Sequence, residues 1–216
     1  MNRLESLRVT EIFFSLQGET KTVGLPTVFI RLTGCPLRCQ YCDTAYAFQG
    51  GQWKTFEAIL ADVSQYQASY VTVTGGEPLA QKACLKLLTL LCDRGYHVSL
   101  ETSGALSIAD VDTRVMRVVD IKTPGSLEVS KNDWSNFDHI LPHDQIKFVI
   151  CDRHDYEWSV DILKKYNLSA KCEVLFSPSA DQISAGELAE WILKDQLPVR
   201  FQIQLHKFLW GNAKGR

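Results

Sequence analysis

The sequence predicts an α/β fold with a mostly parallel sheet, wound into an incomplete β/α barrel that is open on one side. Seven apolar, β-branched runs of strand length recur along the chain, and helical patterns separate several of them. Near-continuous apolar strands are typical of parallel sheets that are covered on both faces, and strand–helix alternation predicts right-handed βαβ units. A closed eight-fold barrel takes about 250 residues. A chain of 216 residues therefore favours an open barrel.

The predicted strands and helices follow one another in a regular order. An N-terminal strand precedes seven further strand patterns, which are Thr27–Thr33, Tyr70–Thr74, His97–Thr102, Arg117–Lys122, Gln145–Ile150, Cys172–Phe176 and Val199–Gln204. Helical patterns with plausible caps cover Thr55–Gln65, Leu79–Arg94, Asp155–Tyr166 and a last segment that runs from a capping box at Ser184 to Lys194. At least one connection between strands is too short for a full helix. No linker is visible, so residues 1–216 are expected to form one domain.

Composition and charge exclude several classes of protein. A net charge of −2 lacks the cationic excess that binding to a nucleic-acid backbone needs. No apolar run approaches the roughly 18 residues of a membrane span, and the N-terminal residues lack the pattern of a secretory signal. Seven cysteines without an export signal make a poor disulfide framework. We therefore expect a cytoplasmic protein that meets neither nucleic acid nor membrane, whose cysteines serve in the core or bind metal.

Three of the cysteines lie within eight residues, in the segment Cys35-Pro-Leu-Arg-Cys39-Gln-Tyr-Cys42. The segment directly follows a predicted strand, and thiolates at this spacing can surround a soft metal centre. A structural zinc ion takes four protein ligands, whereas three thiolates suit a [4Fe-4S] cluster with one open iron. A zinc or redox-sensing site remains the non-enzymatic alternative. The other four cysteines lie singly in helix or strand patterns and are expected to be buried: Cys84, Cys92, Cys151 and Cys172.

The three-cysteine pattern, with an aromatic residue before the last cysteine, resembles that of the radical S-adenosylmethionine (SAM) superfamily. A second segment, Gly75-Gly76-Glu77-Pro78, resembles the superfamily's GGE motif and follows another predicted strand. Several further segments are similar to those of the 7-carboxy-7-deazaguanine synthases: Phe14–Glu19, Cys42–Thr44, Glu101–Gly104, Asp120–Pro124 and Gln204–Lys207. The resemblance runs from about residue 8 to residue 210, nearly the whole chain.

The resemblance implies an activity and its cofactors. Members of that family convert 6-carboxy-5,6,7,8-tetrahydropterin into 7-carboxy-7-deazaguanine with loss of ammonia, on the route to queuosine. A [4Fe-4S] cluster binds and cleaves SAM, the resulting radical abstracts the C6 hydrogen of the substrate, and Mg²⁺ assists. The resemblance also implies a homodimer and an electron donor such as flavodoxin or ferredoxin. An activase of glycyl-radical enzymes, which would use the same cluster on a protein substrate, is the alternative from another reaction class.

The resemblance further implies roles for individual residues. Cys35, Cys39 and Cys42 would ligate the cluster and Thr44 would ligate Mg²⁺, with Glu101 and Thr44 taking part in catalysis. The expected SAM-binding residues are Tyr41, Cys42, Asp43, Gly76, Glu77, Lys122, Ser177 and Pro178. The expected substrate-binding residues are Leu16, Gln17, Gly18, Glu19, Arg31, Thr74 and His206.

Some of these roles also have a physical argument of their own. The amide and amino groups at the edge of a pterin pair well with Gln17 and with the carboxylate of Glu19, although Glu19 could instead be a solvated loop charge. Arg31 lies in an otherwise apolar strand, so we expect it to bind the substrate carboxylate; a buried pair with an acidic residue is the alternative. His206, at the expected end of a strand, could contact substrate or be structural, and Thr44 could be a turn hydroxyl.

Overall fold

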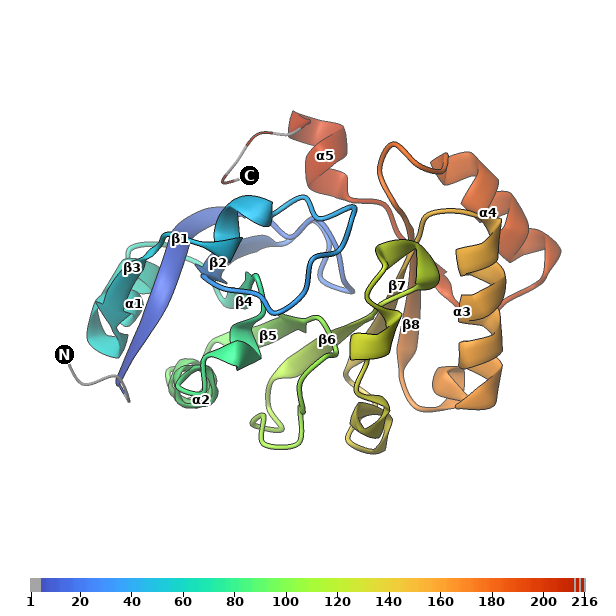
Figure 1. Ribbon diagram of the computed structural model, residues 1–216. Coiled ribbons are helices and arrows are strands. Elements are labelled where there is room, and N and C mark those ends of the chain that lie inside the picture. The colour runs from blue at the N-terminus through green and yellow to red at the C-terminus, as the bar shows by residue number, and fades with distance from the viewer. Residues whose placement is uncertain (1–4, 212, 214, 216) are drawn as a thin grey trace.

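The computed structural model describes residues 5–211, 213 and 215. Its strands form one nine-stranded sheet in the order β3-β1-β2-β4-β5-β6-β7-β8-β9. The strands are β1 (Ser6–Leu16), β2 (Pro26–Leu32), β3 (Gln52–Thr55), β4 (Tyr70–Gly75), β5 (His97–Thr102), β6 (Met116–Ile121), β7 (Gln145–Ile150), β8 (Glu173–Pro178) and β9 (Arg200–Phe201). The strands from β2 to β9 run parallel, while β1 pairs antiparallel with β2 and β3. The sheet curves around a central space without closing (Figure 1), which confirms the open barrel.

Four α-helices accompany the sheet. They are α1 (Phe56–Ser64), α2 (Cys84–Asp93), α3 (Arg153–Lys165) and α4 (Ala185–Lys194), and α5 (Leu205–Trp210) follows the last strand. Figure 1 shows α1 and α2 on one side of the molecule and α3 and α4 on the other. The connections from β5 to β6 and from β6 to β7 carry no α-helix in the described chain. Two aromatic residues of the second connection, Trp134 and Phe137, pack instead against Trp158 of α3 and Tyr166 at its end.

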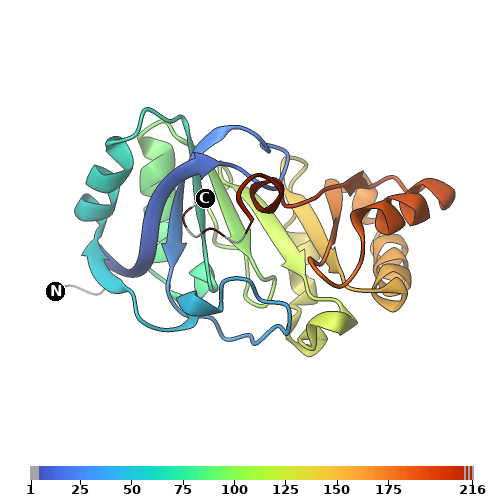
Figure 2. The ribbon, with the colours of Figure 1, turned by 90° about the horizontal axis from the view of Figure 1, so that it is seen from above.

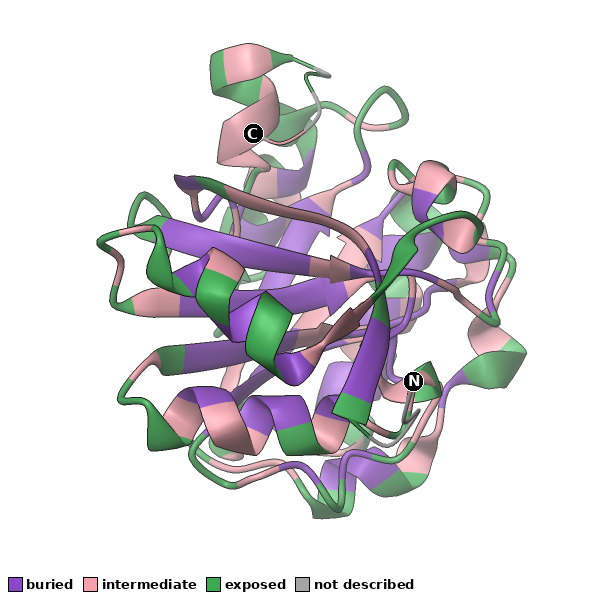
Figure 3. Cartoon of the chain, turned by 90° about the vertical axis from the view of Figure 1, so that its left-hand side faces the viewer, coloured by how far each residue is buried: buried purple, intermediate pink, exposed green. Residues whose placement is uncertain are grey.

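Residue alternation along the parallel strands separates the hydrophobic core from the inside of the barrel. On β2, Val28, Ile30 and Leu32 are fully buried in the core, whereas Phe29 and Arg31 line the central cavity. Figure 3 shows the strands and the inner faces of the helices as buried and the outer faces of the helices as exposed. The layer between sheet and helices is therefore apolar, and the interior of the barrel is left for polar side chains.

The helix ends agree with the sequence in part. Thr55 and Ser184 cap α1 and α4 as predicted, and Gly95 follows α2 with a φ of 83°. The helix α2 was predicted to begin at Leu79 and instead begins at Cys84, because Pro78–Ala80 forms a separate 3-10 turn.

Four other details differ from the sequence-based expectations. The helix α3 begins at Arg153 rather than Asp155, because Asp152 caps it. The last strand was predicted over Val199–Gln204 and shrinks to β9, so His206 lies in α5 rather than at the end of a strand. The short strand β3 was not predicted. Of the four cysteines expected in the core, Cys92 is only partly buried.

The loop between β1 and β2 crosses the open side of the barrel. The backbone N–H of Thr20 donates to Oε1 of Gln202 at 2.7 Å, and Nε2 of Gln202 donates back to the carbonyl of Thr20 at 2.9 Å. The N–H of Lys21 donates to Gln145 at the start of β7, and the N–H of Leu205 donates to the carbonyl of Gly18. The loop therefore forms a floor at the amino ends of the strands, next to the C-terminal segment (Figure 2).

Within the part of the chain that the structure describes, no helix is long and apolar enough to cross a bilayer.

Candidate active site

A cavity of about 710 Å³ lies inside the barrel, above the floor and below the cysteine loop. The loops at the carboxyl ends of the parallel strands, the β1–β2 loop and the C-terminal segment all contribute to its walls. The sequence-predicted residues that line it are Leu16, Gln17, Gly18, Glu19, Arg31, Cys35, Cys39, Tyr41, Cys42, Asp43, Thr44, Thr74, Gly76, Glu101, Lys122, Ser177, Pro178 and His206. The fold thus gathers the predicted residues in one place, with Glu77 as the exception.

Glu77 is fully buried beside the cavity rather than in its lining. Its carboxylate accepts hydrogen bonds from the hydroxyl of Thr102 at 3.0 Å and from the N–H and hydroxyl of Ser103 at 2.7 and 2.5 Å. It also accepts a bond from the N–H of Leu79. The side chain therefore ties the turn after β4 to the end of β5, and any contact with SAM is left to the Glu77 backbone.

Gly76 brings the turn after β4 directly against the cysteine loop. A Cβ atom at this position would lie 2.3 Å from the carbonyl oxygen of Gly34 and 2.8 Å from Cβ of Cys35. Any residue with a side chain would push the two segments apart. The glycine is therefore required for the turn to present its backbone next to the first cysteine.

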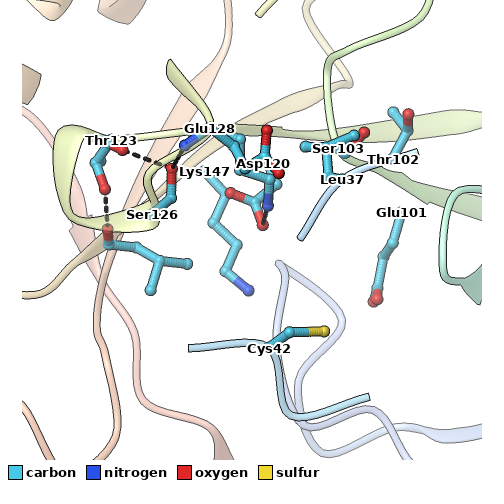
Figure 4. Close-up of polar contacts among 12 residues, drawn as sticks. Leu37, Cys42, Glu101, Thr102, Ser103, Asp120, Thr123, Ser126, Glu128 and Lys147 are labelled. Atoms are coloured by element: carbon cyan, nitrogen blue, oxygen red, sulfur yellow. Dashed lines mark hydrogen bonds and ion pairs between the residues drawn. The ribbon is translucent and has the colours of Figure 1, made fainter. Parts of the chain in front are cut away.

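The three cysteines of the loop line the cavity as free thiols, each of them partly exposed. In Figure 4 the thiol of Cys42 projects into the same space as the side chains of Glu101 and Lys147. Burial raises the pKa of the Cys35 thiol, and it raises the pKa of Cys39 to about 11. These two thiols keep their protons at neutral pH, so a metal centre has to displace the protons when it binds.

The donor set of the loop fits an iron–sulfur cluster. Among the described residues, no three His, Cys, Asp or Glu side chains are grouped closely enough to hold a single metal ion. A [4Fe-4S] cluster makes a different demand, since each of three thiolates binds a different iron and the three sulfurs have to stand apart. Three thiols on one loop that faces a cavity meet this demand.

Three buried polar atoms in the cavity wall lack a hydrogen-bond partner among the described residues. They are the hydroxyl of Tyr41, Oδ1 of Asp120 and the hydroxyl of Ser177. The other oxygen of Asp120 accepts a bond from Nζ of Lys122 at 2.8 Å. An unsatisfied buried polar group costs about 1–3 kcal/mol. This wall is therefore suited to a polar ligand such as SAM, whose ribose and amino-acid groups carry both donors and acceptors.

A pair of opposite charges lies at the floor of the cavity. Glu19 forms an ion pair with Lys147 of β7 and accepts a hydrogen bond from Nε2 of Gln204 at 2.9 Å. Burial alone would raise the pKa of Glu19, but the charge of Lys147 and the bond from Gln204 outweigh it and lower this pKa. Burial would lower the pKa of Lys147, yet the charges of Glu19 and Asp120 raise it. Both partners are therefore ionised at neutral pH.

Glu101 is a second carboxyl of the cavity, also partly buried and close to the first. It accepts hydrogen bonds from the hydroxyl of Thr74 at 3.0 Å and from Nε2 of Gln17 at 3.4 Å. Burial, together with the charge of Glu19, raises the pKa of Glu101. Two neighbouring carboxyl groups with pKa values pushed apart can divide the roles of ionised acceptor and proton carrier between them.

Arg31 forms an acidic pair, as the alternative expected, but the pair is only partly buried. Its Nε donates to Oε1 of Glu11 at 2.7 Å, and the hydroxyl of Tyr46 donates to the same oxygen at 2.8 Å. The guanidinium also lies over the rings of Phe13 and Tyr46. Because Arg31 lines the cavity as well, its role is not limited to this pair.

His206 reaches the cavity from α5. A Cβ atom on Gly18 would lie only 2.2 Å from Nδ1 of His206, so the glycine makes room for the imidazole. Burial lowers the pKa of His206, which leaves the ring neutral at pH 7 with one nitrogen free to accept a hydrogen bond.

Thr44 and Asp43 follow the last cysteine of the loop. The hydroxyl of Thr44 lies 3.7 Å from Sγ of Cys42 and makes no capping bond to the turn Ala45–Phe48 that it precedes. Asp43 accepts a hydrogen bond from Gln204 and forms an ion pair with Lys207, both at 3.2 Å. The C-terminal segment is thus joined to the cysteine loop at this point.

Among the charged residues of the cavity that the sequence analysis missed are Lys147 and Asp120. Each interrupts an apolar strand, in QIKFVI and in MRVVDI. The same argument that singled out Arg31 would have found them, because an unpaired charge on a covered strand is costly.

The comparisons with known proteins agree with this geometry. The profile of the Radical SAM superfamily matches residues 29–170. The open parallel barrel, the cysteine loop and the glycine turn beside it are those of a radical SAM protein, a class that uses a [4Fe-4S] cluster and SAM. Curated relatives from Chlorobaculum tepidum and Koribacter versatilis are 42% and 40% identical, and each is named 7-carboxy-7-deazaguanine synthase. The matches cover 97% and 94% of this chain and 97% of each relative. The chain belongs to the 7-carboxy-7-deazaguanine synthase family.

Two solved structures share the fold. QueE from Escherichia coli is 24% identical with a TM-score of 0.77, and the match covers 93% of this chain and 95% of that one. SuiB from Streptococcus suis, bound to its precursor peptide, is 14% identical with a TM-score of 0.54 over 79% of this chain and 46% of its own.

Proposed function

We propose that this chain converts 6-carboxy-5,6,7,8-tetrahydropterin into 7-carboxy-7-deazaguanine with loss of ammonia, a step on the route to queuosine. The observation that carries the proposal is that a single cavity connects the cysteine loop to the polar floor around Gln17 and Glu19. When bound, the cluster and SAM supply the hydrogen-abstracting radical. The protein's own task is to bind and orient the substrate and to keep water out.

The polar floor supports recognition of a pterin. The ionised carboxylate of Glu19 can accept hydrogen bonds from the amide and amino groups of the ring, and the amide of Gln17 can pair beside it. The terminal nitrogens of Arg31 suit the substrate carboxylate, and Glu101 can hold or release a proton at the ring. The full set proposed to bind substrate is Leu16, Gln17, Gly18, Glu19, Arg31, Thr74 and His206.

The opposite end of the cavity supports binding of the cluster and SAM. Cys35, Cys39 and Cys42 would hold the cluster. The unpartnered atoms of Tyr41 and Ser177 would find their partners in SAM. The remaining SAM contacts are assigned to Cys42, Asp43, the backbone of Gly76 and Glu77, Lys122 and Pro178.

Thr44 is proposed as the protein ligand of Mg²⁺. A hydroxyl suits a hard cation that keeps several waters and takes few ligands from the protein. The absence of a capping bond from this hydroxyl supports the assignment over that of a turn residue. The ion would fix the substrate carboxylate, and Thr44 and Glu101 are the residues proposed to act in catalysis.

Two partners are proposed on the family resemblance. One is an electron donor such as flavodoxin or ferredoxin, and the other is a second copy of the chain in a homodimer. Reduction of the cluster by purified flavodoxin or ferredoxin tests the electron donor. Analytical sedimentation of the reconstituted protein tests the homodimer.

The decisive experiment is a product assay under anaerobic conditions. Reconstituted, reduced protein is incubated with SAM, Mg²⁺ and 6-carboxytetrahydropterin, and the products are analysed by mass spectrometry. The proposal expects 7-carboxy-7-deazaguanine and ammonia. An intact cluster that cleaves SAM without giving the deazaguanine would defeat the reaction assignment, and stoichiometric zinc in place of iron would defeat the radical chemistry. A glycyl radical formed on an added protein substrate would favour the activase instead.

A further inference from the structure

The cysteine loop has no regular secondary structure between Gly34 and Gln40, so its shape depends on contacts from outside. On its outer side the loop is bound to the segment that follows β6. Gln40 donates from its backbone N–H to the carbonyl of Ser126 at 3.3 Å and from Nε2 to the carbonyl of Gly125 at 2.8 Å. The backbone N–H of Arg38 donates to the carboxylate of Glu128 at 2.5 Å. The segment after β6 therefore supports the loop next to Cys39.

That supporting segment forms a tight turn. The 3-10 turn Pro124–Ser126 is closed by the hydroxyl of Ser126, which donates to the carbonyl of Thr123 at 2.6 Å (Figure 4). The same hydroxyl accepts a hydrogen bond from the N–H of Glu128 at 3.1 Å. This bond fixes the backbone position of Glu128, whose carboxylate binds Arg38. The turn thus makes both hydrogen bonds with Gln40, and it orients Glu128 for the third hydrogen bond, with Arg38.

A buried carboxylate from a different element, the helix α3, holds the turn Pro124–Ser126 in place. Asp155, in the first turn of α3, is fully buried and accepts three hydrogen bonds. The donors are the N–H of Gly125 at 2.7 Å, the hydroxyl of Thr123 at 3.0 Å and the N–H of Cys151 at 3.0 Å. A Cβ atom on Gly125 would lie 2.5 Å from Oδ2 of Asp155, so there is no room for a side chain between the turn and the carboxylate.

We propose that Asp155 is a positioning residue for the iron–sulfur cluster. It fixes the turn after β6, and the turn fixes Cys39 through Gln40 at the spacing that the irons require. Asp155 does not line the cavity, so it acts on the cluster only through the turn and the loop. The inference rests on the proposed binding of a [4Fe-4S] cluster by the cysteine loop, and it does not depend on which substrate the enzyme converts. Replacement of residues that hydrogen-bond directly to metal ligands typically changes metal affinity or activity by about 10- to 100-fold, and we expect Asp155, which acts through the turn, to fall within this range.

The test compares iron release from anaerobically reconstituted protein. Asp155→Asn keeps the size of the side chain but places an N–H₂ group among three donors. We expect iron to pass to a ferrous chelator about 10- to 100-fold faster than from the unchanged protein. The electron paramagnetic resonance signal of the reduced cluster should also broaden and respond less to SAM. An unchanged release rate and an unchanged signal would overturn the proposal.

A matched control separates this role from general stability. Asp152 caps the same helix, accepts a bond from the N–H of Asp155 at 2.8 Å and is exposed. Asp152→Asn should lower the melting temperature slightly while leaving iron release within about twofold. If Asp152→Asn released iron as fast as Asp155→Asn, the effect would belong to the helix and the proposal would fail.

If Asp155→Asn fails to fold, a second variant can test the path from the turn to Cys39. Gln40→Ala removes the side-chain bond between the turn and the loop without touching α3. It should also speed iron release, and the double variant should be no faster than the faster single one, because both act along one path. Independent, multiplying effects of the two substitutions would refute that path.

Discussion

Removal of the Lys147 charge should destabilise the protein by about 3 kcal/mol at neutral pH. Lys147→Met leaves the buried carboxylate of Glu19 without its cation and beside a second carboxyl, that of Glu101. Loss of one partner of a buried ion pair costs about 3–5 kcal/mol. Both side chains of this pair remain about 15% exposed, which favours the lower end of that range. For a chain of this length, 1 kcal/mol shifts the melting temperature by about 2–4 °C, so we expect a fall of roughly 6–12 °C.

The effect should depend on pH with a definite sign. The pKa of Glu19 is lowered in the folded protein, so its contribution to stability is present above the unfolded pKa of about 4.5 and is lost as the pH falls. In Lys147→Met, burial instead raises the pKa of Glu19, and the folded state loses stability as the pH rises past 4.5. The deficit of the variant should therefore be larger at pH 7 than at pH 5.

The assay is thermal unfolding of the reconstituted protein under anaerobic conditions, followed by circular dichroism. Lys164→Met, an exposed lysine on α3, is the control for loss of a positive charge and should melt within about 1 °C of the unchanged protein. The double variant Glu19→Gln/Lys147→Met removes both charges and should recover at least half of the lost temperature. If the fall in melting temperature of the double variant equalled the sum of the falls for Lys147→Met and Glu19→Gln measured singly, the reasoning would be refuted.

Four further substitutions test the site. Thr44→Ala should raise the Mg²⁺ concentration that half-maximal activity requires while the cluster absorbance is unchanged; an unaltered Mg²⁺ dependence would show that the ligand is another group. Cys39→Ala should abolish SAM cleavage, measured as release of 5′-deoxyadenosine, and retained cleavage would exclude this cysteine as a ligand. Glu101→Gln should lower kcat by about 100-fold and remove the limb of its pH profile that lies above pH 4.5, because the pKa of Glu101 is raised. Gly18→Ala should push His206 aside, raise the KM for the pterin and cost about 1–3 kcal/mol of stability by calorimetry.

The parallel strands and the residues at their carboxyl ends were predictable because both depend on local pattern. An apolar run such as TVFIRLT is predicted as a covered strand from its own residues alone. Because the cysteines come directly after this run, their loop is placed at the carboxyl end of the strand. The same local reasoning explains why Thr55 and Ser184 were identified as caps.

The differences arise where a distant side chain decides the local structure. Gln202 bonds to the backbone of Thr20, and this tie ends β9 after two residues although the sequence continues as a strand pattern. Arg31 was correctly identified as a charge in need of a partner, but its partner Glu11 stands on a neighbouring strand and pairing of strands is not visible in one sequence. Lys147 and Asp120 carried the same signal as Arg31.

The floor of the cavity has a consequence for how the chain is made. Thr20 and Gln202 are separated by 182 positions, so their contact cannot form until residue 202 has left the ribosome. Contacts of such long range also form slowly. By contrast, the bond from the N–H of Glu77 to the carbonyl of Gly34 joins the glycine turn to the cysteine loop at much shorter range. During synthesis the cysteine loop can thus take up its place against the glycine turn before the contact between Thr20 and Gln202 joins the β1–β2 loop to the end of β9.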